Sequence, residues 1–91
     1  MNEHRLVQCR KYGKPLPGLA TAPLPGSAGT DIYQNVSARA WQEWQELQTM
    51  LINENHLSMR DASARKWLTS QREKFFRNED YERPAGYVPV E

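Results

Sequence analysis

Cysteine is almost missing from this chain of 91 residues, in which Cys9 is the single one. One thiol cannot form an intramolecular disulfide, and it cannot supply a cysteine-rich zinc site. Neither of these two cross-links can therefore stabilise the fold. An isolated thiol is typical of proteins in a reducing compartment, so we expect a cytoplasmic location.

Long apolar runs are missing as well, since the longest is the three residues Met50-Leu51-Ile52. A helix that spans a bilayer needs about 20 apolar residues, so we expect no association with a membrane. Residues 1–5 lead directly into mixed polar sequence, without the apolar stretch of a secretory signal. This pattern also favours the cytoplasm.

An excess of charge of one sign is missing too, because 12 Lys and Arg face 11 Asp and Glu. Nucleic-acid-binding domains usually have a marked basic excess, so this balance disfavours nucleic acid as a partner. The charges are nevertheless segregated, with six basic and two acidic residues in 57–77. The last fourteen residues hold one basic and four acidic side chains. Such segregation either neutralises a basic face within the molecule or leaves a basic patch exposed.

Histidine is scarce, since only His4 and His56 occur. A typical open transition-metal site in proteins uses two histidines and one carboxylate, and this chain has no His-x-x-x-His, Glu-x-x-His or Cys-x-x-Cys pair. His56 falls at an expected helix end, where its ring can interact with the last carbonyl groups. Any metal site would have to be assembled from distant residues or by two molecules. We therefore expect weak and exchangeable metal binding.

The N-terminal part of the chain predicts a short strand and a proline-rich arm. Residues 5–12 alternate imperfectly, which places Val7 and Cys9 on one face of a strand. Residues 14–29 contain four prolines and three glycines. The prolines forbid a helix and allow at most an edge strand around Leu19, so we expect an ordered hairpin arm.

The remaining residues predict three helices. The first begins near Ser27, and Ser37 has the character of an N-cap for a second helix over residues 38–54. Apolar residues recur there with helical spacing. Ser58, with Asp61 three residues later, resembles a capping box for the third helix, which is predicted from about Met59 to Phe76. The short connection between the two long helices predicts that they pack antiparallel.

Together these elements predict a mostly helical α+β fold, in which a short antiparallel strand pair precedes three helices. We expect one compact domain over residues 1–78, with the strand arm at 1–26 and the helices at about 27–76. Residues 79–91 form an acidic tail, whose tyrosines favour docking onto the domain. The helical register of three tryptophans predicts core packing rather than base stacking for Trp41, Trp44 and Trp67.

Several motifs in a fixed order carry a family resemblance. The block Gln48-Thr-Met-Leu-Ile-Asn-Glu54 follows Ala40-Trp41-x-x-Trp44. Upstream lie Pro17-Gly18-Leu19, Pro25-Gly26 and Ile32-Tyr33, and Lys11 stands two residues after Cys9. In this order and spacing the chain resembles the YggX-type family of small bacterial Fe(II)-trafficking, oxidative-damage-protection proteins. The resemblance extends over nearly the whole chain.

The resemblance implies a small protein of cytoplasmic iron handling, which passes Fe(II) toward iron–sulfur cluster synthesis or repair and limits oxidative damage. The distant candidate ligands predict that this Fe(II) is bound weakly and exchangeably. Because the sequence has no phosphate-binding glycine loop and no paired-carboxylate site, we expect no enzymatic activity. The implied partners are iron–sulfur assembly proteins or iron-requiring proteins, and the protein is expected to act as a monomer. In the family, the cysteine matching Cys9 is linked to protection. Cys9 is thus the implied functional thiol and a candidate Fe(II) ligand.

The residues around Cys9 leave two roles open for it. Arg5, Arg10 and Lys11 are close in sequence and would favour a reactive thiolate. Cys9 could equally be a small apolar residue that fills a gap beside Val7.

Two further functions remain open. An interaction module would use a basic third-helix face made of Arg60, Arg65, Lys66, Arg72, Lys74 and Arg77. Such a face could dock on an acidic protein or on nucleic acid. Alternatively, Cys9 could scavenge peroxide, although turnover without a second cysteine would need an external thiol or a disulfide-linked dimer. Surface carboxylates such as Glu43, Glu46 and Glu54 are interpreted as a solvated face.

Overall fold

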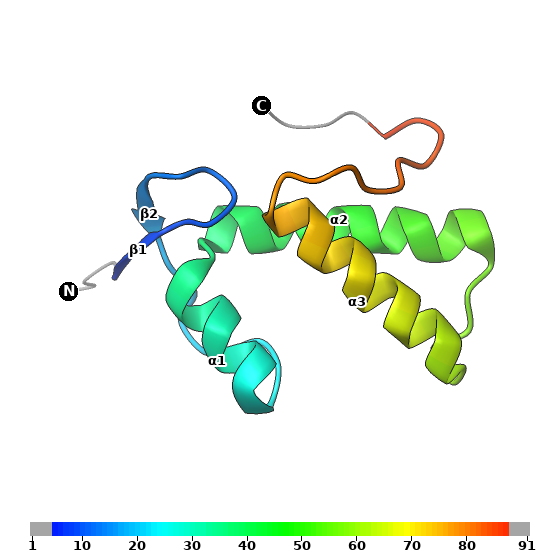
Figure 1. Cartoon of the computed structure of the whole chain (residues 1–91), viewed down its shortest axis with the longest axis horizontal. Coiled ribbons are helices and arrows are strands. Elements are labelled where there is room, and N and C mark those ends of the chain that lie inside the picture. Colours follow the sequence, from blue (N-terminus) through cyan, green and yellow to red (C-terminus); the bar gives the residue numbers. More distant parts are fainter. Residues whose placement is uncertain (1–4, 88–91) are drawn as a thin grey trace. The chain divides into compact units, whose positions relative to one another are not determined.

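The structure is a computed structural model of the chain and describes residues 5–87. Over this range it forms two strands and three helices (Figure 1). In chain order these are β1 (Leu6–Gln8), β2 (Pro15–Pro17), α1 (Gly26–Asn35), α2 (Ala38–Asn55) and α3 (Ala62–Phe76). The predicted α+β fold is therefore confirmed. No helix within residues 5–87 is both long and apolar enough to cross a bilayer.

Internal contacts divide the chain into two compact units, Met1–Gln42 and Glu43–Glu91. The first unit contains β1, β2, α1 and the start of α2. The second contains the remainder of α2, then α3 and the segment that follows it.

In the first unit β1 and β2 pair antiparallel, with Val7 opposite Leu16. Prolines flank Leu16 in β2, which is tolerated because a strand in a two-stranded sheet has a free edge. The edge strand thus lies slightly before the predicted position around Leu19. Alternation along β1 is as predicted, since Val7 is buried and Leu6 is 62% exposed. Cys9 follows on the buried face.

The core of the first unit forms where the arm and α1 meet. Its buried side chains include Val7, Cys9, Ile32, Val36 and Ala40. Gly29 is also buried, and its α-carbon lies so close to the Leu24 carbonyl that an added methyl group would collide with that carbonyl. Glycine at this position therefore allows the proline-rich arm to pack closely against α1.

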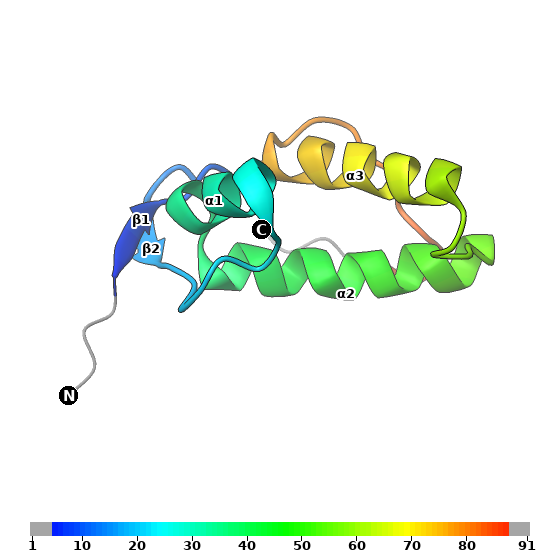
Figure 2. The same ribbon diagram turned by 90° about the horizontal axis from the view of Figure 1, so that it is seen from below.

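In the second unit, the end of α2 and α3 run in opposite directions, as predicted (Figures 1 and 2). Trp44 of α2 contacts Phe75 of α3, with ring centroids 6.0 Å apart. Leu47, Leu51 and Leu68 are buried as well. The core prediction for the tryptophans holds fully only for Trp44, because Trp41 and Trp67 are half-buried. Tryptophan rings are so large that they are seldom fully buried.

The start of α3 differs from the prediction, because the helix begins at Ala62 rather than at residue 59. Asp61 is the N-cap, and its carboxylate accepts a hydrogen bond from the Ser63 N–H at 2.9 Å. The Ser58 hydroxyl instead accepts from the Arg60 N–H at 3.3 Å in the turn before the helix. The turn that reverses the chain after α2 contains Ser58 and Asp61. It also contains His56, whose backbone is in a left-handed conformation at φ 52°.

The segment after α3 contacts that helix within the second unit. Tyr81 is buried edge-on against Phe75, with centroids 5.2 Å apart, and Tyr87 lies edge-on to Tyr81. The Glu82 N–H donates to the side-chain oxygen of buried Gln71 at 2.7 Å. This bond satisfies a buried amide oxygen that would otherwise destabilise the core.

Candidate functional site at the Cys9 thiol

Cys9 stands where β1 ends and a six-residue loop begins. Its N–H donates to the Lys14 carbonyl at 3.0 Å, and its carbonyl accepts from the Gly13 N–H at 2.7 Å. Gly13 has φ 65°, a conformation that glycine adopts without strain. The loop consequently folds back over Cys9, and the N–H groups of Lys11 and Tyr12 bond to its sulfur.

Ser37 contacts the same sulfur from the start of α2. Its hydroxyl lies 3.2 Å from the Cys9 Sγ, and its N–H donates to that sulfur at 3.4 Å. The same hydroxyl accepts from the Ala40 N–H at 3.1 Å, which confirms Ser37 as the cap of α2. Cys9 and Ser37 are both 0% exposed. The thiol therefore lies at the positive end of the helix dipole, shielded from water.

Two opposing effects set the acidity of the Cys9 thiol. Burial raises its pKa, because a charged sulfur loses its hydration. The Ser37 hydroxyl accepts from the thiol at 3.2 Å and can turn its own proton toward a thiolate. This side-chain hydrogen bond and those from the N–H groups of Ser37, Tyr12 and Lys11 lower the pKa, because they stabilise the thiolate. The net result is a lowered pKa. At neutral pH this thiol is more ionised than a free cysteine.

The predicted source of this acidity was wrong, since the nearby arginines are engaged elsewhere. Arg5 donates to the carbonyls of Tyr33 at 3.0 Å and Leu19 at 2.7 Å, and it stacks over the Tyr33 ring. The Arg10 guanidinium binds Asp31 at 2.8 Å. Sequence proximity identified charges, whereas the folded loop presents backbone dipoles. Ser37 was identified as a helix cap, but nothing in the sequence indicated its contact with the thiol 28 residues away.

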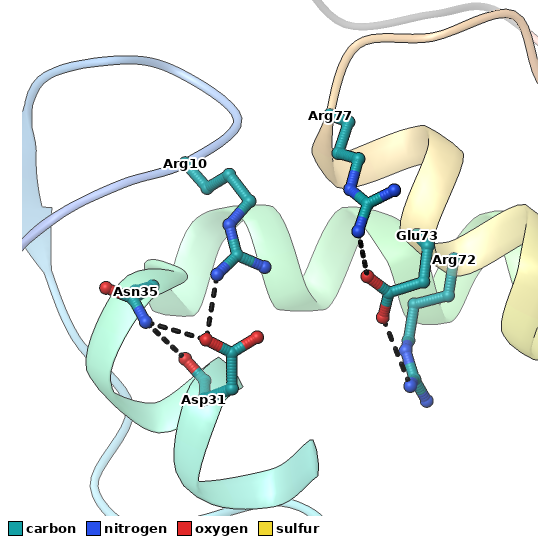
Figure 3. Close-up of polar contacts among 6 residues, drawn as sticks. All are labelled: Arg10, Asp31, Asn35, Arg72, Glu73 and Arg77. Carbon is teal, nitrogen blue, oxygen red and sulfur yellow. Dashed lines mark hydrogen bonds and ion pairs between the residues drawn. The ribbon is translucent and has the colours of Figure 1, made fainter. Parts of the chain in front are cut away.

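A polar cluster holds the Cys9 loop on α1 (Figure 3). Asp31 accepts from Arg10 and from the Asn35 side-chain amide, each at 2.8 Å. The backbone N–H of Arg10 also donates to the Asn35 carbonyl at 2.8 Å. The residue next to Cys9 is thus fixed to α1 by both its main chain and its side chain.

With this geometry in view, comparison with known proteins identifies the family. A family model described as bacterial Fe(2+) trafficking matches residues 3–90. This chain belongs to that family. The resemblance inferred from the motifs is therefore confirmed.

Individual relatives agree with this assignment. The chain is 58% identical over 87 residues to a probable Fe(2+)-trafficking protein of Marinobacter nauticus, covering 96% of this chain and 97% of the relative. It is 54% identical over 85 residues to proteins of the same name from Stutzerimonas stutzeri and Teredinibacter turnerae, covering 93% of this chain. The matches cover 94% and 97% of those two relatives. The family is named for trafficking and not for catalysis.

The candidate metal ligands are not gathered into a cluster in the part of the chain that the structure describes. There, no three His, Cys, Asp or Glu side chains lie close enough together to hold a metal ion. His56 is exposed at the end of α2, and His4 lies outside the described residues. Cys9 contacts a serine and backbone amides. Weak, exchangeable Fe(II) binding stays a prediction.

The predicted basic face of α3 is partly neutralised within its own unit. Glu73 lies 3.4 Å from Arg72 and 3.8 Å from Arg77 through its two carboxylate oxygens (Figure 3). Arg65 donates to the Met59 carbonyl at 2.7 Å. Arg60, Arg65, Lys66 and Arg77 are exposed, whereas Arg72 and Lys74 are at least half-buried. The six residues therefore do not form one uniform face.

Proposed function

We propose that this protein carries Fe(II) as cargo in the cytoplasm, supplies it for iron–sulfur cluster synthesis or repair, and limits oxidative damage. In this proposal the Cys9 thiol is its chemically active group, and the protein acts as a monomer on iron–sulfur assembly or iron-requiring partners. Family membership supports the trafficking role. The observation that supports a role for Cys9 is the set of N–H groups, together with the Ser37 hydroxyl, that surrounds its sulfur.

A stabilised thiolate is suited to both halves of this function. Thiolates are good ligands for iron in iron–sulfur chemistry, and they are the form of cysteine that reacts with oxidants. One thiolate without other protein ligands nearby would hold Fe(II) weakly, as a carrier requires. Water or groups of the partner would complete the coordination.

Burial adds a condition to this chemistry. Because the sulfur is 0% exposed, Fe(II) or an oxidant contacts it only when the loop between β1 and β2 moves. The thiolate is thereby kept from indiscriminate oxidation between transfers. Access to Cys9, rather than its acidity alone, would then set the rate of reaction.

The direct test is an anaerobic calorimetric titration of the protein with Fe(II). We expect saturable binding that Cys9→Ser weakens, and that a matched exposed variant, Glu46→Gln, leaves unchanged. Equal binding by wild type and Cys9→Ser would remove the thiol from the ligand set. No binding by either protein would contradict direct carriage.

A second test addresses the oxidative role in cells. A strain without the protein is supplied with wild type or Cys9→Ser, and the activity of iron–sulfur enzymes is measured after peroxide exposure. We expect the variant to accumulate normally but to lose protection. Full protection by Cys9→Ser would contradict an active thiol.

A further inference from the structure

A polar pocket in the second unit lies outside the Cys9 site. It has a volume of about 140 Å³ and is lined by residues of α2, of α3 and of the turn between them. Trp44 and Leu68 supply apolar surface, while the polar lining is Gln48, Thr69, Arg65 and Arg72. Two arginines and no carboxylate line this pocket, so its chemistry favours an anion.

Arg72 lines this pocket, and its Nε lies beneath the surface with unused hydrogen-bonding capacity. Its side chain is only 12% exposed, and its Nε is buried without a hydrogen-bond partner. Among the buried side-chain N and O atoms of residues 5–87, no other lacks a partner. Its ion pair with Glu73 uses Nη2 at the long distance of 3.4 Å (Figure 3). A guanidinium offers five N–H donors, and buried donors in proteins are nearly always paired.

Arg65 completes a pair of cations two helical turns apart. Residues seven apart share one face of a helix, so Arg65 and Arg72 both reach the pocket. The bond from Arg65 to the Met59 carbonyl holds its guanidinium in place. The Gln48 amide and Thr69 hydroxyl add neutral donors along the same lining.

We propose that this pocket binds a small oxyanion, of the carboxylate or phosphate type. The planar N–H edge of arginine matches two oxygens of such a group. The Nε of Arg72 lacks an acceptor and is covered by protein atoms, so binding through it requires the guanidinium to turn toward the pocket. The volume admits inorganic phosphate or a short dicarboxylate rather than a polymer. This proposal uses no residue of the Cys9 site, so it stands or fails independently of the iron function proposed above.

The test is an NMR titration of the full chain with inorganic phosphate and, separately, with malonate, at constant ionic strength set by chloride. We expect saturable shifts of the Arg72 Nε–H and of the Gln48 side-chain amide with at least one of these anions. The anion that binds more tightly identifies the phosphate or the carboxylate type. Shifts that grow linearly without saturation, or none, would overturn the proposal.

Substitutions locate the site. Arg72→Met should weaken binding about tenfold or more, because it removes the charge and all the N–H donors while keeping an unbranched apolar stem. Lys74→Met, which removes a cation of the same helix outside the pocket lining, should leave binding unchanged. If both variants weakened anion binding equally, the effect would be one of general charge, and the proposed site would be contradicted.

A second variant guards against a folding defect in Arg72→Met. Arg65→Gln alters an exposed residue and should weaken binding about threefold, since one cation of two is lost. Thermal unfolding of each variant is measured in parallel. Two results together would contradict the proposal. The first is an unchanged anion affinity of folded Arg65→Gln, and the second is a loss of anion binding in Arg72→Met that is explained by its unfolding.

Discussion

At the scale of single residues, Cys9 combines two properties that usually exclude each other. It is buried in the core beside apolar residues, and yet its pKa is lowered. Neutral donors achieve this, because N–H and O–H groups can be buried with the sulfur, whereas the arginines remain bound elsewhere.

The acidity of Cys9 predicts a pH-dependent contribution to stability. Because its pKa is lower in the folded state, the folded protein releases this proton before the unfolded chain does. The resulting stabilisation is complete above the unfolded pKa of about 8.5 and is lost as pH falls through the folded pKa. The difference in unfolding free energy between wild type and Cys9→Ala should therefore increase with pH across this window. Urea unfolding under reducing conditions measures it, and a constant difference would contradict a stabilised thiolate.

Ser37 should influence both stability and acidity. Ser37→Ala removes the N-cap of α2 and one donor to the sulfur, so we expect a loss of about 1–2 kcal/mol and a higher pKa of Cys9. Urea unfolding gives the first quantity, and the pH dependence of thiolate ultraviolet absorbance gives the second. Ser63→Ala, at an exposed position of α3, is the matched control and should leave the Cys9 pKa unchanged. A Cys9 pKa that does not rise in Ser37→Ala would remove this hydroxyl from the account.

At the scale of elements, we expect the loop between β1 and β2 to control access to the thiol. It is short and closed by its own backbone bonds, and Arg10 ties it to Asp31 and Asn35 on α1. Local opening of such a loop costs less free energy than global unfolding. Reaction of Cys9 with a bulky disulfide reagent should therefore report the fraction of molecules with an open loop.

Loosening the tie to α1 should speed that reaction. Asp31→Asn removes the charge that Arg10 binds, and a partly exposed ion pair contributes about 0.2–1 kcal/mol, so labelling should accelerate about 1.5- to fivefold. Stopped-flow thiol labelling provides the rate. Asp80→Asn breaks a comparable exposed pair with Arg83 in the second unit and is the control. Equal rates in wild type and Asp31→Asn would mean that another motion limits access.

At the scale of the whole molecule, the chain holds two distinct features in two units. The donors around Cys9 belong to the first unit, and the arginine pocket belongs to the second. No described residue takes part in both sets of contacts. The chemistry proposed for Cys9 and the anion binding proposed for the pocket should therefore be separable by substitution.

This separation predicts additive behaviour. Arg72→Met should leave the pKa and the labelling rate of Cys9 unchanged, because substitutions at sites without shared partners act independently. Cys9→Ser should likewise leave phosphate or malonate binding unchanged. Titrations of both single variants and the double variant provide the comparison. A change in either direction would reveal coupling between the units.

Local chemistry let the sequence alone determine the order of elements and several positions within them, while its motifs indicated the family by resemblance. Ser37 as a cap follows from its hydroxyl before a helical stripe, and the shared face of Val7 and Cys9 follows from alternation along a strand. The predicted start of α3 was wrong because Ser58 and Asp61, three residues apart, are both good helix caps and compete for that position. Only the geometry of the chain reversal after α2 decides between them.

Tertiary structure alone decided what surrounds the thiol and what lines the pocket. Ser37 contacts Cys9 across 28 residues, and Gln48 and Arg72 line one pocket from two different helices. The direction of a side chain toward a distant partner depends on how the elements pack, which no local pattern encodes. For the same reason, arginines adjacent to Cys9 in sequence bind other partners, while backbone N–H groups, which every sequence has, stabilise its sulfur.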